Sequence, residues 1–183
     1  MTSDPQDDAP VSAPGEQQIR NGAAIGNETR KDAKARIGFV IVAHGALAGA
    51  LLSALEHVVG AQPGTAAIAI EPTDDLHDRQ REINEAVTRV EAGAGVVVVT
   101  DMFGGTPSNL ALGAMTRPGV EVIYGANLPL LIKLAKCRDR PIEDAVLQAL
   151  AAGAKYIDSA ARMLDPQSAR GETPDSTPRV GGA

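Results

Sequence analysis

His44 lies at the end of a strongly apolar stretch of the chain, where an ionisable side chain is unexpected. The segment IGFVIVA spans residues 37–43, and His44 and Gly45 follow it directly. An imidazole that carries a proton on one nitrogen keeps a lone pair on the other, which can act as a nucleophile. A buried histidine more often packs in a core with its nitrogens hydrogen-bonded, so the neighbouring elements must decide between packing and chemistry.

Asp101 occupies the same position relative to a second apolar stretch. The segment GVVVVT spans residues 95–100, and Asp101 comes next. A carboxylate at this place can accept a hydrogen bond from one imidazole nitrogen, fix the tautomer and leave the other nitrogen free. It would also stabilise the positive charge that the ring gains when that nitrogen is phosphorylated. We therefore expect His44 and Asp101 to act as a pair if the fold brings the two strand ends together.

Two glycines and a helix start make up the segment FGGTPSN, residues 103–109. Gly104 and Gly105 allow backbone N–H groups to approach a ligand without a Cβ in the way. Thr106 resembles a helix N-cap with Pro107 at the first helical position, and a helix N-terminus attracts anions. The segment can therefore hold a dianion, although taken alone it is more often an ordinary strand-to-helix turn.

The elements that must position these residues alternate between strands and helices. Apolar and β-branched runs predict strands at residues 37–43, 66–70, 95–100 and 120–125. Amphipathic segments predict helices within residues 46–60, 73–93, 106–119, 127–137 and 142–164, the second of them opened by Thr73 as N-cap. This order predicts an α/β fold: an open, mostly parallel sheet of four strands, with room for one more edge strand, helices on both faces and a flavodoxin-like strand order.

The predicted sheet also predicts where a ligand binds. In open parallel sheets, ligands bind at the carboxyl ends of the strands, near the point where the strand order switches. His44 and Asp101 each follow a strand directly, and Gly125 and Asn127 lie at the end of the fourth strand. The three loops are therefore expected to meet at one rim.

Composition and charge exclude several classes of function. The net charge is −6, and the chain has no Trp, two Phe and two Tyr, so it lacks the basic surface and the aromatic side chains typical of a nucleic-acid binder. Its single cysteine, Cys137, cannot form an intramolecular disulfide, and no Cys/His spacing indicates a metal site. No apolar run approaches the ~20 residues of a membrane span, and no secretion signal is evident. We expect a cytoplasmic protein with no metal, no nucleic-acid partner and no membrane insertion.

The two ends of the chain differ in composition from its middle. Residues 1–35 and 165–183 are rich in Asp, Pro, Gly and Gln or Ser and poor in large apolar side chains. Such segments bury too little surface to offset the entropy of ordering, so we expect a disordered tail at each end and one folded domain at residues 36–164.

The other two histidines do not indicate a site. His57 and His77 fall in predicted helices, and we expect both on solvated helix faces. The acids beside His77, in the segment DDLHD, suit a helix N-terminus and need no metal to explain them.

Three segments, taken together, resemble the mannose-type enzyme IIA component of the bacterial phosphoenolpyruvate:sugar phosphotransferase system: IGFVIVAHGALAGALLSALE, VVVVTDMFGGTPSNLAL and VEVIYGANLPLLIKL. The resemblance covers about residues 36–164 and leaves out both tails. It implies that His44 is the phosphorylated histidine, Asp101 its partner and Thr106 a hydroxyl near the phosphate. A Gly-x-Asn-x-Pro loop is expected to shape the same rim. The resemblance thus implies that the phosphate-binding residues are Gly45, Gly104, Gly105, Thr106 and Asn127.

The resemblance implies a homodimeric phosphocarrier, a phosphotransferase that takes a phosphoryl group from HPr onto His44 and passes it to a IIB component for sugar uptake or regulation. No cofactor is implied, and the chain has no GxxxxGK[ST] motif for ATP. Phe103 stands where sugar-transporting members often have Trp. No IIB domain is evident after residue 164, so the acceptor is expected to be a separate protein.

Two other readings use the same fold. A regulatory binding module would report phosphotransferase flux through the state of His44 without passing the group on. A flavodoxin-like or receiver-like domain is disfavoured, because the first would need aromatic side chains at the rim and the second an acidic cluster after the first strand. The phosphoryl-transfer subunit of dihydroxyacetone kinase shares the fold, but the GGTPSN segment favours the mannose-type branch.

Overall fold

A computed structural model describes residues 35–164 of the chain. The tails and the domain boundaries expected from composition lie largely outside these residues. The elements, in chain order, are β1 (Gly38–His44), α1 (Leu47–Val59), β2 (Thr65–Ile70), α2 (Leu76–Val90), β3 (Val96–Thr100), α3 (Thr106–Ala114), β4 (Val120–Tyr124), α4 (Leu128–Lys136), α5 (Ile142–Lys155) and α6 (Ala160–Leu164).

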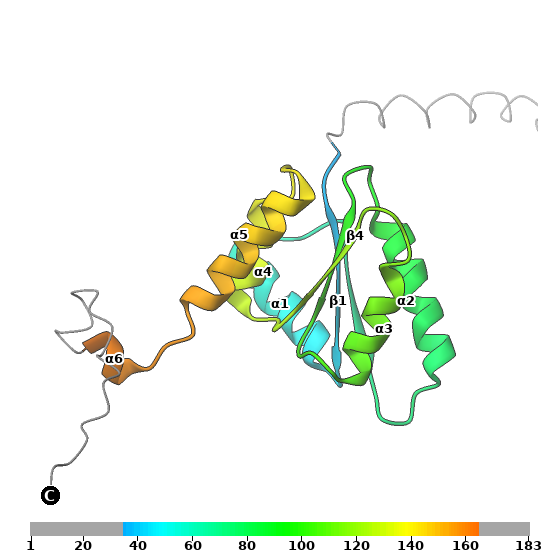
Figure 1. Ribbon diagram of the computed structural model, residues 1–183, viewed down its shortest axis with the longest axis horizontal. Helices are drawn as coiled ribbons and strands as arrows, with labels where there is room; N and C mark the ends of the chain where they lie inside the picture. Colours follow the sequence, from blue (N-terminus) through cyan, green and yellow to red (C-terminus); the bar gives the residue numbers. More distant parts are fainter. Residues whose placement is uncertain (1–34, 165–183) are drawn as a thin grey trace, which may run out of the picture. The chain divides into compact units, whose positions relative to one another are not determined.

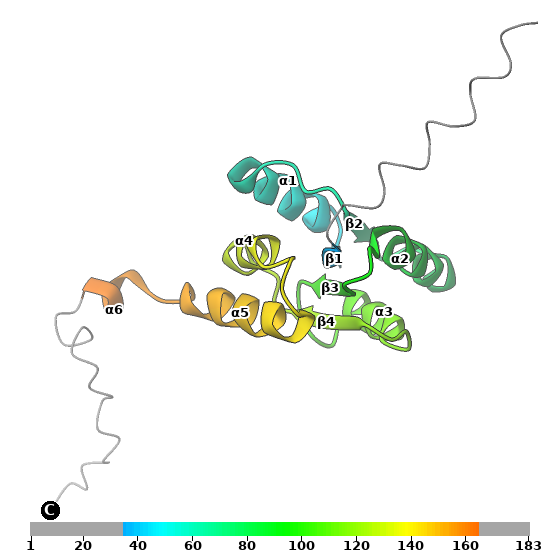
Figure 2. The ribbon, with the colours of Figure 1, turned by 90° about the horizontal axis from the view of Figure 1, so that it is seen from above.

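The four strands form one parallel sheet (Figure 1), and their order is β2-β1-β3-β4 (Figure 2). This confirms the α/β fold and the flavodoxin-like order predicted from the sequence. β1 and β3 are the central pair, and every residue of β3 is buried. Central strands of a parallel sheet are covered on both faces, which explains why their sequences are almost continuously apolar.

Helices cover both faces of the sheet. Seen from above, α1, α4 and α5 lie on one side and α2 and α3 on the other (Figure 2). Along β1, Phe39 and Ile41 belong to the core under the first group, whereas Val40 and Val42 belong to the core under the second. The period of two in a strand thus gives each layer alternate residues of the same apolar run.

Two of the helices begin at other residues than the sequence predicts. Asp75, not Thr73, is the N-cap of α2, because its carboxylate accepts hydrogen bonds from the N–H groups of His77 and Asp78 at 2.8 and 3.0 Å. α3 begins one residue earlier than the sequence predicts, because Gly105 is its N-cap and Thr106 its first helical residue. The two helix starts show that the residue type alone does not identify the cap among several suitable neighbours.

The last predicted helix, residues 142–164, is two helices. α5 ends at Lys155, and α6 begins after Ser159, whose hydroxyl accepts a hydrogen bond from the N–H of Arg162 at 3.3 Å. Serine is a preferred N-cap residue, and an N-cap residue is not helical. The chain is therefore not helical at Ser159, where the periodicity predicts a continuous helix. No residue of α6 is buried. Among residues 35–164, the helices are all too short or too polar to cross a membrane.

Arg138 closes the amino end of the sheet, opposite the rim where ligands are expected. Its guanidinium is buried, with the residue 3% exposed, and lies 5.0 Å from the centroid of the Phe39 ring. It donates to three backbone carbonyls, those of Ile37, Pro63 and Gly64, at 2.6, 2.7 and 2.9 Å. Burial lowers the pKa of Arg138 to about 10, which still leaves it charged at neutral pH. One side chain therefore ties the starts of β1 and β2 to the α4–α5 connection.

Replacing Arg138 tests this anchor. Arg138→Ala leaves buried carbonyls without their donors, so we expect it to lower the free energy of unfolding by about 2–4 kcal/mol in urea denaturation. Arg138→Lys should recover only part of this loss, because an ammonium lacks the planar fork of donors. The exposed Arg140 offers a matched control, and Arg140→Ala should change stability by less than about 0.5 kcal/mol. Equal stability of Arg138→Ala and the unchanged protein would refute the anchor.

Candidate functional site

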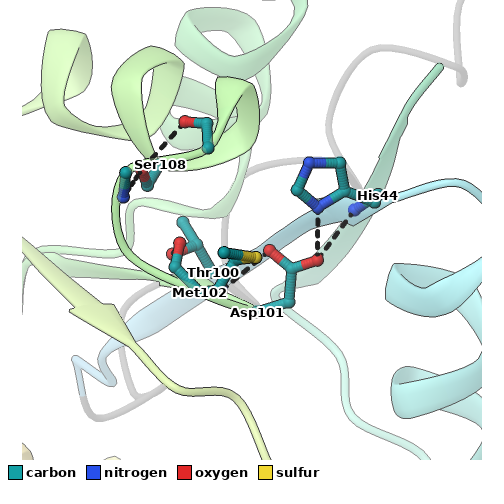
Figure 3. Close-up of polar contacts among 7 residues, drawn as sticks. His44, Thr100, Asp101, Met102 and Ser108 are labelled. Atoms are coloured by element: carbon teal, nitrogen blue, oxygen red, sulfur yellow. Dashed lines mark hydrogen bonds and ion pairs between the residues drawn. The ribbon is translucent and has the colours of Figure 1, made fainter. Parts of the chain in front are cut away.

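His44 and Asp101 are in contact at the carboxyl end of the sheet (Figure 3). His44 Nδ1 lies 2.8 Å from Asp101 Oδ2, and the backbone N–H of His44 donates to the same oxygen at 3.1 Å. A carboxylate only accepts hydrogen bonds, so the proton of a neutral imidazole is on Nδ1 and the lone pair on Nε2. The His44 side chain is 50% exposed and that of Asp101 12% exposed. The side chain that carries the Nε2 lone pair is therefore half exposed, while the carboxylate that bonds its other nitrogen is mostly covered.

Both carboxylate oxygens of Asp101 accept hydrogen bonds that hold the side chain in place. Oδ2 receives the two bonds from His44, and Oδ1 accepts the N–H of Met102 at 2.9 Å. Burial raises the pKa of Asp101, but the hydrogen bonds from the His44 ring, the His44 backbone and Met102 outweigh burial, so the net pKa lies below the ordinary aspartate value. Asp101 is therefore an anion at neutral pH, which is the state that fixes the tautomer of His44.

The register of the sheet brings the two residues together. β1 and β3 are parallel neighbours, and Val42 pairs with Thr100 at the end of β3. β1 continues to His44 because β2 pairs with it on the other side, where His44 lies opposite Ile70. Asp101, one residue past β3, therefore lies beside the end of β1. The sequence places both residues at strand ends, and the strand order makes them neighbours.

The glycine loop approaches the free side of the imidazole. A Cβ on Gly105 would lie 3.0 Å from His44 Cε1 and 3.3 Å from Nε2, and Gly105 has an ordinary φ of −91°. Gly104 has a φ of +85°, and a Cβ there would meet nothing within 4 Å. The two glycines thus serve different purposes. Gly104 permits the left-handed turn, and Gly105 leaves room beside Nε2 of His44.

Some of the N–H groups predicted to hold phosphate are already used within the protein. The N–H of Gly45 donates to the carbonyl of Ile70 at 3.0 Å, and that of Gly104 donates to Ser108 Oγ at 3.0 Å. The first N–H groups of a helix have no acceptor in the preceding turn, and in α3 these include Gly105 and Thr106. Helix geometry therefore favours Gly105 and Thr106 as the donors for an anion.

Asn127 is the N-cap of α4 and organises the third loop of the rim. Its side-chain oxygen accepts the N–H of Leu130 at 3.0 Å, and its amide nitrogen donates to the carbonyl of Gly125 at 3.2 Å. Ala126, which lies between Gly125 and Asn127, donates its N–H to the carbonyl of Thr100 at 2.9 Å. Both ends of the Asn127 amide are thus engaged in its own loop, which is bonded to the end of β3.

An apolar rim lies beside the site. Met102, Phe103 and Tyr124 are 55%, 63% and 55% exposed, and the two aromatic rings are 5.0 Å apart between centroids. Met102 and Phe103 follow Asp101 in the chain, and Tyr124 ends β4. Large exposed apolar side chains that gather in one place mark surfaces that bind other molecules.

The two histidines that the sequence does not assign to a site lie at exposed helix positions. His57 and His77 are exposed on α1 and α2. Among residues 35–164, no group of three or more His, Cys, Asp or Glu side chains could hold a metal ion.

Ser108 is a residue of this region that the sequence does not identify. Its side chain is buried, and its hydroxyl bonds the glycine loop. The only signal for it was a serine just after Thr106 and Pro107, a common residue in the first turn of a helix.

The chain is similar in sequence to known components of the phosphotransferase system. It is 30% identical over 104 residues to the mannose-specific EIIAB component of the phosphotransferase system (PTS) of Escherichia coli strain K12, a match that covers 56% of this chain and 32% of that protein. It is 33% identical over 96 residues to the sorbose-specific EIIA component of Klebsiella pneumoniae, covering 52% of this chain and 70% of that protein. The chain thus matches only about a third of the length of the E. coli relative.

Solved structures of the same kind have the same fold. The mannose/sorbose-specific IIA subunit of Enterococcus faecalis superposes with a TM-score of 0.62 at 25% identity, covering 68% of this chain and 94% of that one. The PTS component EIIA of Streptococcus agalactiae superposes with a TM-score of 0.61 at 25% identity, covering 68% and 98%. The family described as "PTS system fructose IIA component" matches residues 38–151, more than half of the chain, and the protein therefore belongs to this mannose- and fructose-type IIA family.

Proposed function

We propose that the protein is a phosphocarrier in which Nε2 of His44 accepts a phosphoryl group from the phosphohistidine of HPr and passes it to a IIB component. The observation that carries this proposal is the His44–Asp101 pair. The 2.8 Å contact at Nδ1 leaves the lone pair on Nε2, in a side chain that is 50% exposed. Membership of the IIA family, and relatives named as mannose-specific and sorbose-specific PTS components, support HPr as the donor and a IIB component as the acceptor in this proposal.

The transfer needs no acid or base from elsewhere. The Nε2 lone pair of His44 attacks phosphorus, an N–P bond forms at His44, and the N–P bond of the donor breaks with its electron pair returning to the donor nitrogen. His44 keeps its proton on Nδ1, so its ring gains positive charge. Asp101 stabilises that charge through the hydrogen bond that already exists in the unphosphorylated protein, so little reorganisation is needed.

The remaining site residues have supporting roles in this proposal. Gly105 leaves space for the phosphoryl oxygens beside Nε2, and the N–H groups of Gly105 and Thr106 with the Thr106 hydroxyl are the donors that receive them. Gly45, Gly104 and Asn127 shape the loops around the group. A homodimer belongs to the same proposal, and light scattering of the full chain measures it.

His44→Ala tests the acceptor. Incubation with phosphoenolpyruvate, enzyme I and HPr should label the unchanged protein with an acid-labile phosphate, and His44→Ala should carry none because the nucleophile is gone. His57→Ala is the matched control, since His57 is exposed on α1 away from the rim, and it should be labelled normally. Label retained by His44→Ala would refute the assignment of His44.

Asp101→Asn tests the partner. An asparagine presents one oxygen and one NH2 group, so it cannot accept from His44 on one side and from Met102 on the other as Asp101 does. We expect the imidazole to lose its fixed orientation and the rate of phosphorylation to fall about 100-fold in rapid-quench measurements. A rate equal to that of the unchanged protein would show that the carboxylate has no part in transfer.

Gly105→Ala tests the space beside Nε2. Its backbone has an ordinary φ, so alanine fits the chain, but the new Cβ would press on Cε1 and Nε2 of His44 at 3.0 and 3.3 Å. We expect an intact fold and a rate of phosphorylation at least about 10-fold lower. Gly49→Ala in α1 meets nothing within 4 Å and should leave the rate unchanged. Normal transfer by Gly105→Ala would mean that the phosphoryl group does not occupy this space.

A further inference from the structure

Ser108 is a buried polar residue under the glycine loop, and the proposed transfer step gives it no role. The residue is 1% exposed and lies in the first turn of α3. Its Oγ accepts the N–H of Gly104 at 3.0 Å and donates to the carbonyl of Gly105 at 2.9 Å (Figure 3). Both the donor and the acceptor capacity of this hydroxyl are thus directed at the two glycines.

The glycine loop needs such a support. Gly104 has a φ of +85° and open space where a side chain would be, and its neighbours Met102 and Phe103 are more than half exposed. A backbone of this kind has little packing to define it, and glycine loses more conformational entropy on ordering than any other residue. The carbonyl of Gly105 also accepts the N–H of Asn109 at 3.1 Å, but that bond belongs to the helix and does not reach Gly104.

The position of the loop matters because the backbone of Gly105 lies close to the imidazole. A Cβ at Gly105 would be 3.0 Å from His44 Cε1, so the backbone there already lies close to the ring. A displacement of the Gly104–Gly105 backbone by a few tenths of an ångström would change the space beside Nε2 and the aim of the Gly105 and Thr106 N–H groups. Ser108 is the side chain that couples α3 to both glycines.

We propose that Ser108 is a positioning residue that holds Gly104 and Gly105 against His44, and so sets the rate at which His44 accepts a phosphoryl group; this part rests on the function proposed above. Its hydroxyl takes up the N–H of Gly104, which leaves the N–H groups of Gly105 and Thr106 to face the anion. Ser108 touches neither His44 nor the phosphoryl group and acts through the loop alone.

The test compares Ser108→Ala with the unchanged full chain. Alanine favours a helix and fills nearly the same volume, so the fold should persist. In single-turnover transfer from phospho-HPr, the maximal rate should fall about 10-fold, while the phospho-HPr concentration at half-maximal rate stays within about two-fold, because docking does not involve Ser108. Ser108→Thr keeps the hydroxyl and should recover the rate.

Two NMR measurements report on the loop without any phosphate. The Gly104 amide should exchange with solvent about 10-fold faster in Ser108→Ala, because its acceptor is gone. The Cε1 resonance of His44 should shift, because Gly105 lies against that atom. Ile83→Val, a mild truncation in the core beneath α2, is the control for general destabilisation and should change neither readout nor the rate.

These outcomes separate the two proposals. A Ser108→Ala protein that transfers within two-fold of the unchanged rate, or that keeps the Gly104 amide protection and the His44 resonance, overturns the role of Ser108. Slow transfer in Ile83→Val as well would assign the effect to stability and also overturn it. If the unchanged protein takes no phosphate, the phosphocarrier function fails, and the two NMR measurements still decide whether Ser108 holds the loop against His44.

Discussion

The hydrogen bond between His44 Nδ1 and Asp101 Oδ2 is the interaction on which the site depends. It determines which nitrogen carries the proton, which way the ring faces and where positive charge is tolerated. The bond can form only because β1 and β3 are parallel neighbours whose ends lie at the same edge. The apolar residues of these two strands supply no chemistry themselves, but their burial between helices on both sides makes the positions of His44 and Asp101 rigid.

The two edges of the sheet serve opposite purposes. At the amino edge, a buried guanidinium satisfies the carbonyls of Ile37, Pro63 and Gly64 and joins three segments of the chain. At the carboxyl edge, a histidine is half exposed and exposed apolar side chains lie nearby. The buried polar bonds of Arg138 thus lie at one edge of the sheet, and the exposed side chains lie at the other, where the proposed transfer takes place.

The sequence predicts the sheet and the pair better than it predicts the loops. Long apolar runs identify the strands, and strand polarity places His44 and Asp101 at one edge without further information. The role of Ser108 depends on the left-handed turn at Gly104, which brings an N–H over the hydroxyl, and no pattern of residue types specifies that contact. Arg138 was missed for a related reason, since an arginine in a polar segment is expected at the surface and not against three carbonyls.

The exposure of the His44 side chain indicates which kind of phosphoryl donor the site suits. A small phosphate donor must be enclosed by the protein that uses it, since water would otherwise compete for the transferred group. Here the His44 side chain is half exposed. Asp101 orients the ring through Nδ1, and the glycine loop lies close to Cε1 and Nε2. The other walls of a closed reaction site can come from a protein that covers the apolar rim of Met102, Phe103 and Tyr124. The exposed histidine beside an apolar rim therefore supports the proposed transfer between two protein side chains over transfer from a small donor.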